Sequence, residues 1–579
     1  MPSAKQDPSR SPEWQIAAPA TLQATRLIES LRISPMLAQL LINRGFDDPA
    51  LAQEYLEGSL ADIPSPQLLT DMDKAVARVV QAIERHERIC VYGDYDLDGI
   101  SASTILYSFL LHYRSDVQLF IPHRERDGYG LQRAALDQLA RDGVRLIITC
   151  DNGTSAHAEI AYAAQLKMDV VVTDHHSLPE QFPPAVAILN PMRPSTPLAF
   201  RALSGTGVAF MLVLALRRVL REVRTWIETP NLKRMLDLVT LGTVADIVPL
   251  VGVNRVLVRE GLEVIASRRR PGIKALLEVA GVEPDEAINT ITVGYRLAPR
   301  LNAAGRLEDA RLSVDVLMTE DMSTARRLAQ QLEQLNRRRQ TLEEQIVHEM
   351  TEQFLAEPSP RASYVFASEQ WHHGVVGVAA SRLVELTHRP GIVLAIHQGE
   401  ARGSGRSLPG IDLVAALRES HEVLLRYGGH QMAAGMTLRA ENLGIFRDQF
   451  EQAIRRQLEG QEPQRILKID AELPLQALNE SLLADLARMK PFGPGNREPV
   501  FCTRDLTVQD MKTVGRGHLR MRVSQAGTSF ASIGFRLARL AHPELTQHPV
   551  SIAYHPEISF WRGNRSIQLR LCDLRAHGA

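Results

Sequence analysis

Apolar residues between positions 71 and 176 follow two alternating patterns. Apolar residues every three or four positions predict helices at 71–87, 101–113, 131–143 and 158–169. Short apolar runs between them predict strands at 88–94, 117–122, 144–151 and 170–176. Strands that alternate with helices in this way indicate βαβ units and a parallel sheet. Ligands of such sheets bind outside the carboxyl ends of the strands, so we expect a functional site there.

The remaining segments predict further domains by the same criteria. Residues 1–70 hold short helical patterns broken by Pro and Gly, which predicts a helical cap on the segment that follows. A long charged stretch with apolar residues at helical spacing predicts a connecting helix. A second α/β pattern comes next, and the short strands after Pro463 predict a small barrel. The fold class is therefore α/β and multidomain, with predicted boundaries at 1–70, 71–322, 323–356, 357–462 and 463–579.

Three carboxylates crowd the end of the first predicted strand. In GDYDLDG (93–99), Asp94, Asp96 and Asp98 occupy alternate positions, so an extended segment directs them to one side. They repel one another unless cations neutralise them. For this run alone, a solvated acidic turn is an equal alternative. An EF-hand loop would need a Glu at position 105, which is Ile.

Two other strand ends and one apolar stretch carry the same kinds of side chain. Asp151 ends the strand at 144–151, and TDHHS (173–177) ends the strand at 170–176. Asp246 lies among apolar neighbours in GTVADIVPL (242–250), where a carboxylate is costly unless it meets a cation or hydrogen-bond donors. A mixed set of carboxylates and imidazoles suits Mn²⁺ or Mg²⁺ better than a metal that prefers thiolates. Two such ions form the usual clamp for hydrolysing a phosphodiester.

Composition and charge exclude several classes of protein. The four cysteines form no CxxC pair, which argues against a disulfide framework or a thiolate zinc site and fits the reducing cytoplasm. The apolar run at 208–216 is too short to span a bilayer, so we expect no membrane association. The net charge is −1, yet the segment from Arg497 onward holds 12 Lys+Arg against 6 Asp+Glu. Unless this asymmetry is chance, a basic module binds a polyanion at that end.

Several motifs resemble one known family over nearly the whole chain. GDYDLDG, the DNG at Asp151, TDHH and GTVADIVPL are similar to the four motifs of the DHH phosphoesterase superfamily. RGSGRS (402–407) and GGHQMAAG (428–435) resemble its accessory DHHA1 domain. With LSGTGVAF, YRLAPRLNAAGR and KPFGPGNREPVF, the array is similar to the bacterial RecJ family of single-strand-specific exonucleases. The resemblance implies a DHH parallel-sheet domain and a DHHA1 α/β domain joined by the long helix, with a C-terminal OB-fold β-barrel.

The resemblance also implies roles for individual residues. Two divalent cations, Mn²⁺ or Mg²⁺, would be held by Asp96, Asp98, Asp151, His175 and Asp246, with Asp151 bridging them. Asp94 and Asp174 would complete or orient this set, since ligating imidazoles usually donate their second N–H to an acceptor. His176 would face the scissile phosphate. These eight residues form the predicted catalytic set.

Contacts to the nucleic acid are expected at three places. RGSGRS suits a phosphate nest, or is a plain turn; by resemblance Ser404 and Arg406 hold the 5′-terminal phosphate, with Arg124 reaching it from the catalytic domain. Arg300 and Arg306 line the same channel or form structural ion pairs, and His430 contacts a phosphate or packs in a core. The basic C-terminal segment adds Trp561, Arg562 and Arg565 as a track with stacking partners, although an aromatic there could instead fill the barrel.

The resemblance implies a 5′→3′ exonuclease specific for single-stranded DNA. It would release 5′-mononucleotides in DNA repair and recombination, as a cytoplasmic monomer that works with single-strand-binding protein and a helicase. One alternative is a nano-RNA or cyclic-dinucleotide phosphodiesterase, which would not need the basic barrel. Another is an inactive DNA-binding scaffold, which would not need complete ligand motifs.

Overall fold

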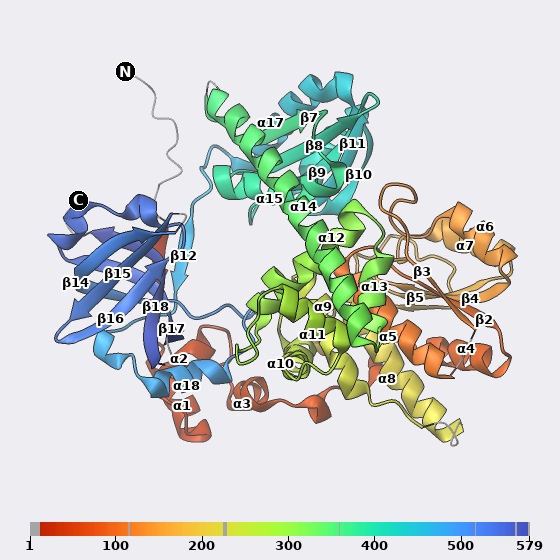
Figure 1. Ribbon diagram of the computed structural model, residues 1–579, viewed down its shortest axis with the longest axis horizontal. Helices are drawn as coiled ribbons and strands as arrows, with labels where there is room; N and C mark the ends of the chain where they lie inside the picture. Colours follow the sequence, from red (N-terminus) through yellow and green to blue (C-terminus); the bar gives the residue numbers. More distant parts are fainter. Residues whose placement is uncertain are drawn as a thin grey trace. The chain divides into compact units, whose positions relative to one another are not determined.

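The computed structural model describes residues 12–113, 116–223, 228–357, 359–515, 517–561 and 564–576. They form two compact units (Figure 1). The parallel-sheet unit comprises Gly58–Thr341 and Pro491–Arg497. The barrel unit comprises Met1–Glu57, Leu342–Lys490 and Glu498–Ala579.

A five-stranded parallel sheet forms the centre of the first unit. Its strands are β2 (Arg88–Tyr92), β3 (Val117–Phe120), β4 (Val144–Cys150), β5 (Asp169–Thr173) and β6 (Ala187–Leu189). They lie in the order β3-β2-β4-β5-β6, and every pairing is parallel, as predicted. After β2 the chain adds β3 on one side of β2, and it then crosses over to add β4 on the other side of β2. This reversal puts a topological switch point between β2 and β4, where open α/β sheets bind ligands.

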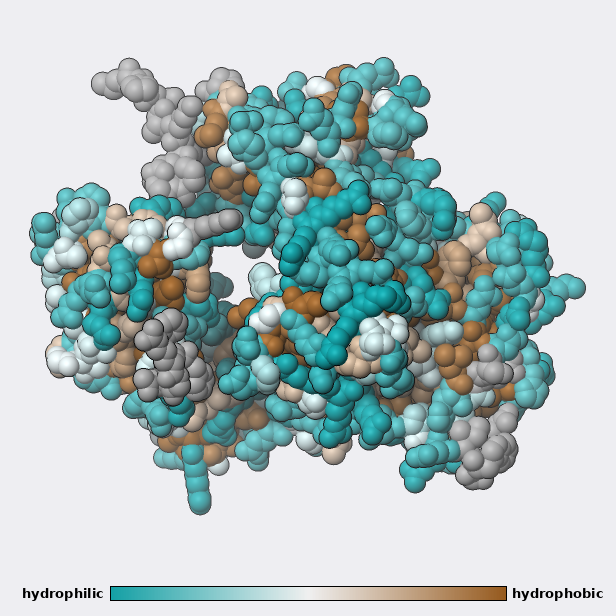
Figure 2. All heavy atoms as spheres, in the orientation of Figure 1, coloured by the Kyte–Doolittle hydropathy of each residue, from teal (hydrophilic) through white to brown (hydrophobic). Residues whose placement is uncertain are grey.

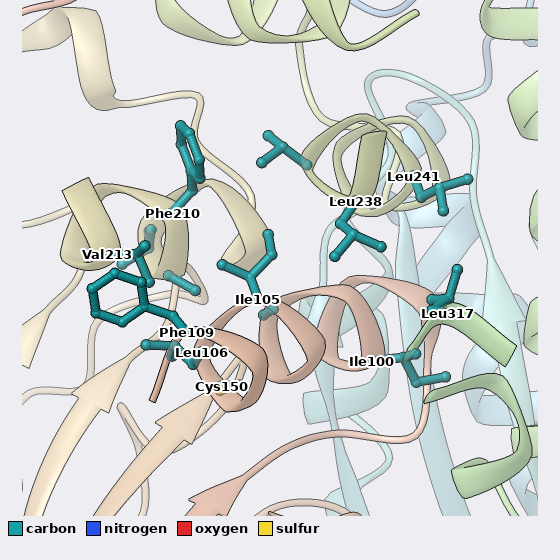
Figure 3. Close-up of a cluster of buried hydrophobic side chains, with 14 of the residues drawn as sticks. Ile100, Ile105, Leu106, Phe109, Cys150, Phe210, Val213, Leu238, Leu241 and Leu317 are labelled. Atoms are coloured by element: carbon teal, nitrogen blue, oxygen red, sulfur yellow. The ribbon is translucent and has the colours of Figure 1, made fainter. Parts of the chain in front are cut away.

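Helices cover both faces of this sheet. One face packs against α4 (Met72–Glu84), α5 (Leu97–Tyr113) and α8 (Gly205–Val223), and the other against α6 (Arg133–Arg141) and α7 (His157–Gln165). α5 is buried nearly all round because α9 (Leu236–Ala245) packs on its other side. Figure 3 shows Phe109 of α5 next to Val213 of α8, and Ile105 below Leu238 of α9. The site at the start of α5 therefore rests on a rigid support.

The unit continues as a run of helices and ends in the predicted long helix. These are α10 (Gly252–Ala266), α11 (Pro271–Val279), the π-helix η5 (Thr292–Leu297), α12 (Ala298–Leu307) and α13 (Arg311–Met318). α14 (Met322–Ala356) has 35 residues, close to the predicted 323–356, and continues into the barrel unit. Its buried residues include Leu328, Leu332 and Ile346, and hydrophilic residues cover its viewed side in Figure 2. Within the described residues, no helix has the length and apolar character needed to cross a membrane.

The barrel unit contains the second α/β sheet. Its strands are β7 (Tyr364–Ser368), β8 (Gly391–His397), β9 (Glu400–Arg406), β10 (Leu424–His430) and β11 (Ala433–Arg439), in the order β10-β11-β9-β8-β7. α15 (His373–Thr387) packs on β8 and β9, whereas α16 (Leu413–Arg418) and α17 (Leu443–Leu458) share a core with Ala434, Met436 and Leu438 of β11. Side chains of β9 at even positions therefore face away from that core.

Five strands close into the predicted barrel. They are β14 (Phe501–Val514), β15 (His518–Gln525), β16 (Thr528–Gly534), β17 (Val550–Trp561) and β18 (Asn564–Ala576). β14 pairs with both β15 and β17, and β18 with both β16 and β17, so the ring has no open edge. β13 (Ala471–Glu472) joins beside β14. The expected fold class, two α/β domains and a C-terminal OB-type barrel, is confirmed.

The N-terminal segment differs from the expected cap. β1 (Glu13–Ile16) pairs in parallel with β12 (Ile466–Ile469), and Trp14 Nε1 donates to Asp573 Oδ2 at 2.7 Å. The helices α1 (Thr21–Leu31), α2 (Pro35–Ile42) and α3 (Pro49–Glu57) follow, and Tyr55 of α3 donates to the Met489 carbonyl just after α18 (Glu480–Arg488) at 3.0 Å. Residues 13–57 thus pack on the C-terminal part of the chain. Local patterns could not show this because the partners are more than 400 residues away.

Candidate metal centre

The predicted catalytic residues converge at the carboxyl ends of the parallel strands. Asp94 follows β2, Asp98 lies in the first turn of α5, and Asp151 follows β4 directly. Asp174, His175 and His176 follow β5, and Asp246 ends α9. Asp94, Asp98, Asp151 and Asp174 are buried residues, each at most 2 % exposed. Sequence positions 94 to 246 therefore meet at one edge of the sheet, next to its switch point.

His175 lies at the middle of this cluster. Its Nε2 is 3.1 Å from Asp151 Oδ1, 3.4 Å from Asp246 Oδ2 and 3.7 Å from Asp98 Oδ2. Burial lowers the pKa of His175, which favours the neutral imidazole that a metal requires. Three groups offer ligand atoms within 4.8 Å of one another: Asp94–Asp96–Asp151, Asp98–His175–Asp246 and Asp151–His175–His176. Asp151 and His175 each belong to two of the three groups, so these two residues connect the set.

The buried carboxylates fit divalent cations. Among the described residues, none donates a hydrogen bond to the buried Oδ1 atoms of Asp94 and Asp151. Burial and the neighbouring Asp96 raise the pKa of Asp94 to about 8, and burial and Asp98 raise that of Asp246 to about 9. Burial and the neighbouring Asp98 also hold the pKa of Asp151 well above its usual range. Such a set of oxygens repels itself without cations, and carboxylate with imidazole suits Mn²⁺ or Mg²⁺.

Asp98 is oriented by the start of α8. Its carboxylate accepts from the Gly205 N–H at 2.7 Å, from the Thr206 N–H at 3.0 Å and from Thr206 Oγ1. A Cβ on Gly205 would lie 2.6 Å from Asp151 Oδ1, and one on Gly242 would lie 2.6 Å from Asp98 Oδ1. Glycine is needed at both positions because the helices approach the carboxylates so closely. The sequence motifs suggested no role for these residues, although Gly205 and Thr206 belong to LSGTGVAF and Gly242 begins GTVADIVPL.

Asp174 positions His176 and belongs to none of the three ligand groups. It accepts from the backbone N–H groups of Thr154, His175 and His176, and from His176 Nδ1 at 2.7 Å. Burial opposes a charge on His176, but this bond and the attraction to Asp174 raise its pKa to about 9. Asn190, which the sequence did not suggest, donates to the His176 carbonyl at 2.9 Å. The predicted orienting role of Asp174 therefore concerns His176 in this structure.

The backbone is strained next to two of the predicted ligands. Asp151 has φ of 63° and Ile247, directly after Asp246, has φ of 59°. The left-handed region costs a non-glycine residue about 1–2 kcal/mol and is rare for a β-branched one. The sequence placed Asp246 in a buried apolar stretch, but its side chain is 29 % exposed and Ile247 is 71 % exposed. Asp246 is thus less enclosed than its apolar neighbours in the sequence suggested, because α9 ends there and Ile247 points to solvent.

Comparison with known proteins extends over the whole chain. Residues 88–243 match the DHH family N-terminal domain, 361–456 the DHHA1 domain and 469–573 the RecJ OB domain. The single-stranded-DNA-specific exonuclease RecJ of Dickeya dadantii is 36 % identical, covering 94 % of this chain and 96 % of that protein. That of Escherichia coli K12 is also 36 % identical, covering 93 % and 95 %. The chain belongs to the RecJ family.

A solved RecJ structure agrees in fold. RecJ of Thermus thermophilus in complex with Mn²⁺ superposes with a TM-score of 0.84 at 32 % identity, covering 98 % of this chain and 80 % of that one. The same protein has been solved with Mg²⁺, with a TM-score of 0.76. The curated relatives are exonucleases, which supports that reading of the sequence over the short-substrate phosphodiesterase and the inactive scaffold.

The arginines predicted to line the RecJ-family channel fall into different environments. Arg124 stacks on the Tyr95 ring at 3.8 Å and donates to the Gly305 carbonyl at 3.0 Å, beside the Asp94–Asp98 loop. Arg300 instead pairs with Glu333 at 2.7 Å and is mostly buried. This is the structural ion pair that the sequence offered as the alternative to a channel contact. Arg306 lies in the last turn of α12 and is half-buried.

The predicted phosphate residues of the barrel unit share one face of the second sheet. Ala433 of β11 pairs with Arg406 on one side and His430 on the other, so all three side chains point to that face. A Cβ on Gly377 of α15 would lie 3.3 Å from Ser404 Oγ and 3.7 Å from an Arg406 guanidinium nitrogen. Burial lowers the pKa of Arg406, which shows that its charge is partly desolvated. A desolvated arginine beside a serine is suited to a phosphate.

The barrel presents basic residues that our sequence analysis missed. Arg565 is ion-paired with Glu480 at 3.2 Å, and Arg562 and the Trp561 side chain lie outside the described residues. Arg520 and Arg522 of β15 point outward, with Lys512 of β14 paired beside Arg520. These three basic residues, here called the barrel patch, have no acidic partner within 4 Å in the described part of the chain. The alternation of Arg with apolar residues in HLRMRVS could have revealed them.

Proposed function

We propose that this chain removes 5′-mononucleotides from single-stranded DNA in the 5′→3′ direction by metal-dependent hydrolysis. The observation that carries the proposal is the cluster of seven possible ligand side chains in a RecJ-family chain. Two of them have buried oxygens that receive no hydrogen bond from any residue the structure describes. Related RecJ proteins are single-stranded-DNA-specific exonucleases, and one has been solved with Mn²⁺ and with Mg²⁺.

The residues of the metal centre have different roles in this proposal. Asp96, Asp98, Asp151, His175 and Asp246 would hold two cations, with Asp151 shared between them and Asp94 completing the set. When bound, such ions supply a water that is nucleophilic at neutral pH and neutralise charge on the phosphodiester. Asp174 fixes the Nδ1 proton of His176, and Nε2 of the same ring would contact the scissile phosphate. The strained backbone at Asp151 keeps its carboxylate turned into the cluster.

The 5′→3′ direction of hydrolysis depends on recognition of the 5′-terminal phosphate. Ser404 and Arg406 hold it, with His430 on the same face of the second sheet. Within the parallel-sheet unit, Arg124 and Arg306 contact the strand beside the metal centre. A charge-assisted contact favours a phosphate over a neutral end. Arg406→Ala should therefore remove most of the preference for 5′-phosphate over 5′-hydroxyl strands while Mn²⁺ affinity stays the same. An unchanged preference would place the terminal phosphate elsewhere.

The barrel holds the rest of the strand. The barrel patch supplies charges for successive phosphates, and Trp561, Arg562 and Arg565 extend the track at the β17–β18 end. The outer face of the second and third strands is where OB-folds bind oligonucleotides, and β15 and β16 occupy those positions. In the cell we place the enzyme in DNA repair and recombination, as a cytoplasmic monomer assisted by single-strand-binding protein and a helicase.

One experiment tests the function as a whole. Single strands, duplexes and short RNAs with a 5′ label are incubated with the full chain, with and without Mn²⁺, and the products are sized. Release of labelled mononucleotide from single-stranded DNA alone, dependent on Mn²⁺, is expected. Preferential hydrolysis of short RNA would instead support the short-substrate phosphodiesterase, and binding without hydrolysis would support the scaffold.

A further inference from the structure

Three large apolar side chains beside the metal centre are exposed to solvent. Ile247 is 71 % exposed, Ile291 is 55 % exposed and Tyr295 is 79 % exposed. We call these three residues the apolar shelf. None of them takes part in the metal chemistry described above, and none packs in the core of the unit. Exposed apolar side chains grouped in this way commonly mark a binding surface.

Ile247 is held outward by an unfavourable backbone conformation. It follows Asp246 directly, its N–H bonds to the Val244 carbonyl at 3.3 Å, and its φ is 59°. Glycine or asparagine would adopt this turn at lower cost. A β-branched side chain that remains exposed in such a turn is best explained by a use for the side chain itself.

Tyr295 is presented by the π-helix η5, a kind of helix that is frequent at functional sites. Ile291 lies four residues earlier, so the two side chains project from the same side of the helix. The rest of the helix is anchored. Arg296 donates to the Ala280 carbonyl at 3.0 Å, and Val293 and Leu297 are buried. These anchors prevent η5 from rotating Tyr295 into the core.

The shelf adjoins the metal centre through α9. A Cβ on Gly294 would lie 3.7 Å from Val244 Cγ1, so η5 packs against the last turn of α9. That turn leads in two residues to Asp246, whose Oδ2 lies 3.4 Å from His175 Nε2. The three shelf residues therefore belong to the end of α9 and to the helix that packs on it, next to the Asp246 side of the metal centre.

We propose that the apolar shelf binds the unpaired nucleobase of the nucleotide whose phosphate lies at the metal centre, with Tyr295 stacking on it. The inference deepens the proposed function and rests on it. Every base has a flat apolar face, so this contact is tolerant of sequence. A base within a duplex has both faces covered by its neighbours, so the shelf selects strands whose bases can leave the stack.

The test removes the base and the ring separately and together. Single strands with a 5′-phosphate carry an abasic nucleotide at position 1, 2 or 3, and KM and kcat are measured with Mn²⁺. For the parent chain, the abasic residue should raise KM roughly tenfold at one position and little at the others. On the normal strand, Tyr295→Ala should raise KM by a similar factor. On that abasic strand, the variant and the parent chain should have the same KM. Tyr295→Phe should restore the parent KM, because the ring alone stacks.

Control variants separate this contact from general damage. Ile247→Gly keeps the left-handed turn, removes the side chain and should raise KM severalfold without changing the Mn²⁺ affinity. Leu111→Ala, at the other end of α5 about 20 Å along that helix, removes a similarly apolar exposed side chain and should change neither constant. Independent effects of Tyr295→Ala and the abasic site would overturn the shelf and leave the exonuclease proposal intact. Absence of any single-strand hydrolysis would instead refute the proposed function.

Discussion

Asp98 of the metal centre and Arg522 of the barrel patch both have ionisable side chains, but Asp98 is buried and hydrogen-bonded whereas Arg522 is exposed to solvent. The Asp98 side chain is 1 % exposed, and its carboxylate accepts hydrogen bonds from two backbone N–H groups and a threonine hydroxyl. Arg522 is exposed, and the one hydrogen bond of its side chain among the described residues is a 3.4 Å contact to Ser529. The first environment fixes the orientation of the carboxylate, whereas the second leaves the guanidinium in contact with water.

This difference follows from what each region must do. Hydrolysis needs ligands in a desolvated, preorganised arrangement, because electrostatic stabilisation is strong only where water is excluded. Holding a flexible strand needs many weak contacts that can exchange, and exposed charges provide these through counterion release. Substitutions in the two regions should therefore differ in size, in salt dependence and in which step they affect.

The largest effect is expected for Asp151→Ala. Loss of the bridging carboxylate should lower kcat on single-stranded DNA roughly 10³-fold or more, while strand binding persists. Single-turnover hydrolysis and binding are measured on the same preparation. Asp169→Ala, at the amino end of β5, is the matched control and should retain activity. Near-normal hydrolysis by Asp151→Ala in Mn²⁺ would remove the basis for a two-metal centre.

Mn²⁺ should stabilise the parallel-sheet unit. Cations relieve the repulsion that raises the pKa values of Asp94, Asp151 and Asp246, and ligands that bind the native state stabilise it by mass action. At about 100 times the dissociation constant, the gain in the free energy of unfolding is about 2.7 kcal/mol. Urea titrations with Mn²⁺ or with a chelator measure it. The same gain in Asp151→Ala would show that the cation binds elsewhere.

The barrel patch should contribute a smaller, salt-dependent effect. Arg520→Ala combined with Arg522→Ala should weaken binding of long single strands severalfold, and the slope of log K against log salt should fall by about 1.4 for two lost phosphate contacts. Hydrolysis of very short strands should change little. Arg418→Ala with Arg456→Ala removes two exposed charges from α16 and α17 and is the control. An unaltered salt slope in the β15 variant would mean that the strand follows another path.

Arg565→Ala should have the smallest effect. The arginine is 52 % exposed and its charge is already offset by Glu480, so we expect about a twofold loss of affinity and a slope change of at most about 0.7. Glu480→Gln should slightly strengthen binding, because it frees the guanidinium. If Arg565→Ala has a larger effect than the β15 pair, the β17–β18 end is the principal track.

Much of the candidate site could be predicted from the sequence because its residues lie at the ends of locally encoded strands. The periodicity of residues 88–176 predicted β2, β3, β4 and β5, and covalent order then put Asp94, Asp151 and His175 at one edge of the sheet. The roles of Arg300 and Arg306 stayed open, since an arginine has the same local pattern in an ion pair as in a phosphate site. Only the position of Glu333 made Arg300 structural.

The sequence by itself thus determined which segments are helices or strands, and which strand ends carry ligands, because both depend on neighbours along the chain. The tertiary structure alone decided how those ligands are held. Gly205 and Thr206 donate to Asp98 across more than 100 residues, and β1 pairs with β12, which lies about 450 residues later. It also decided that Ile247 faces solvent beside Asp246. Such contacts arise from the packing of whole helices and sheets, which leaves no periodic trace at either partner.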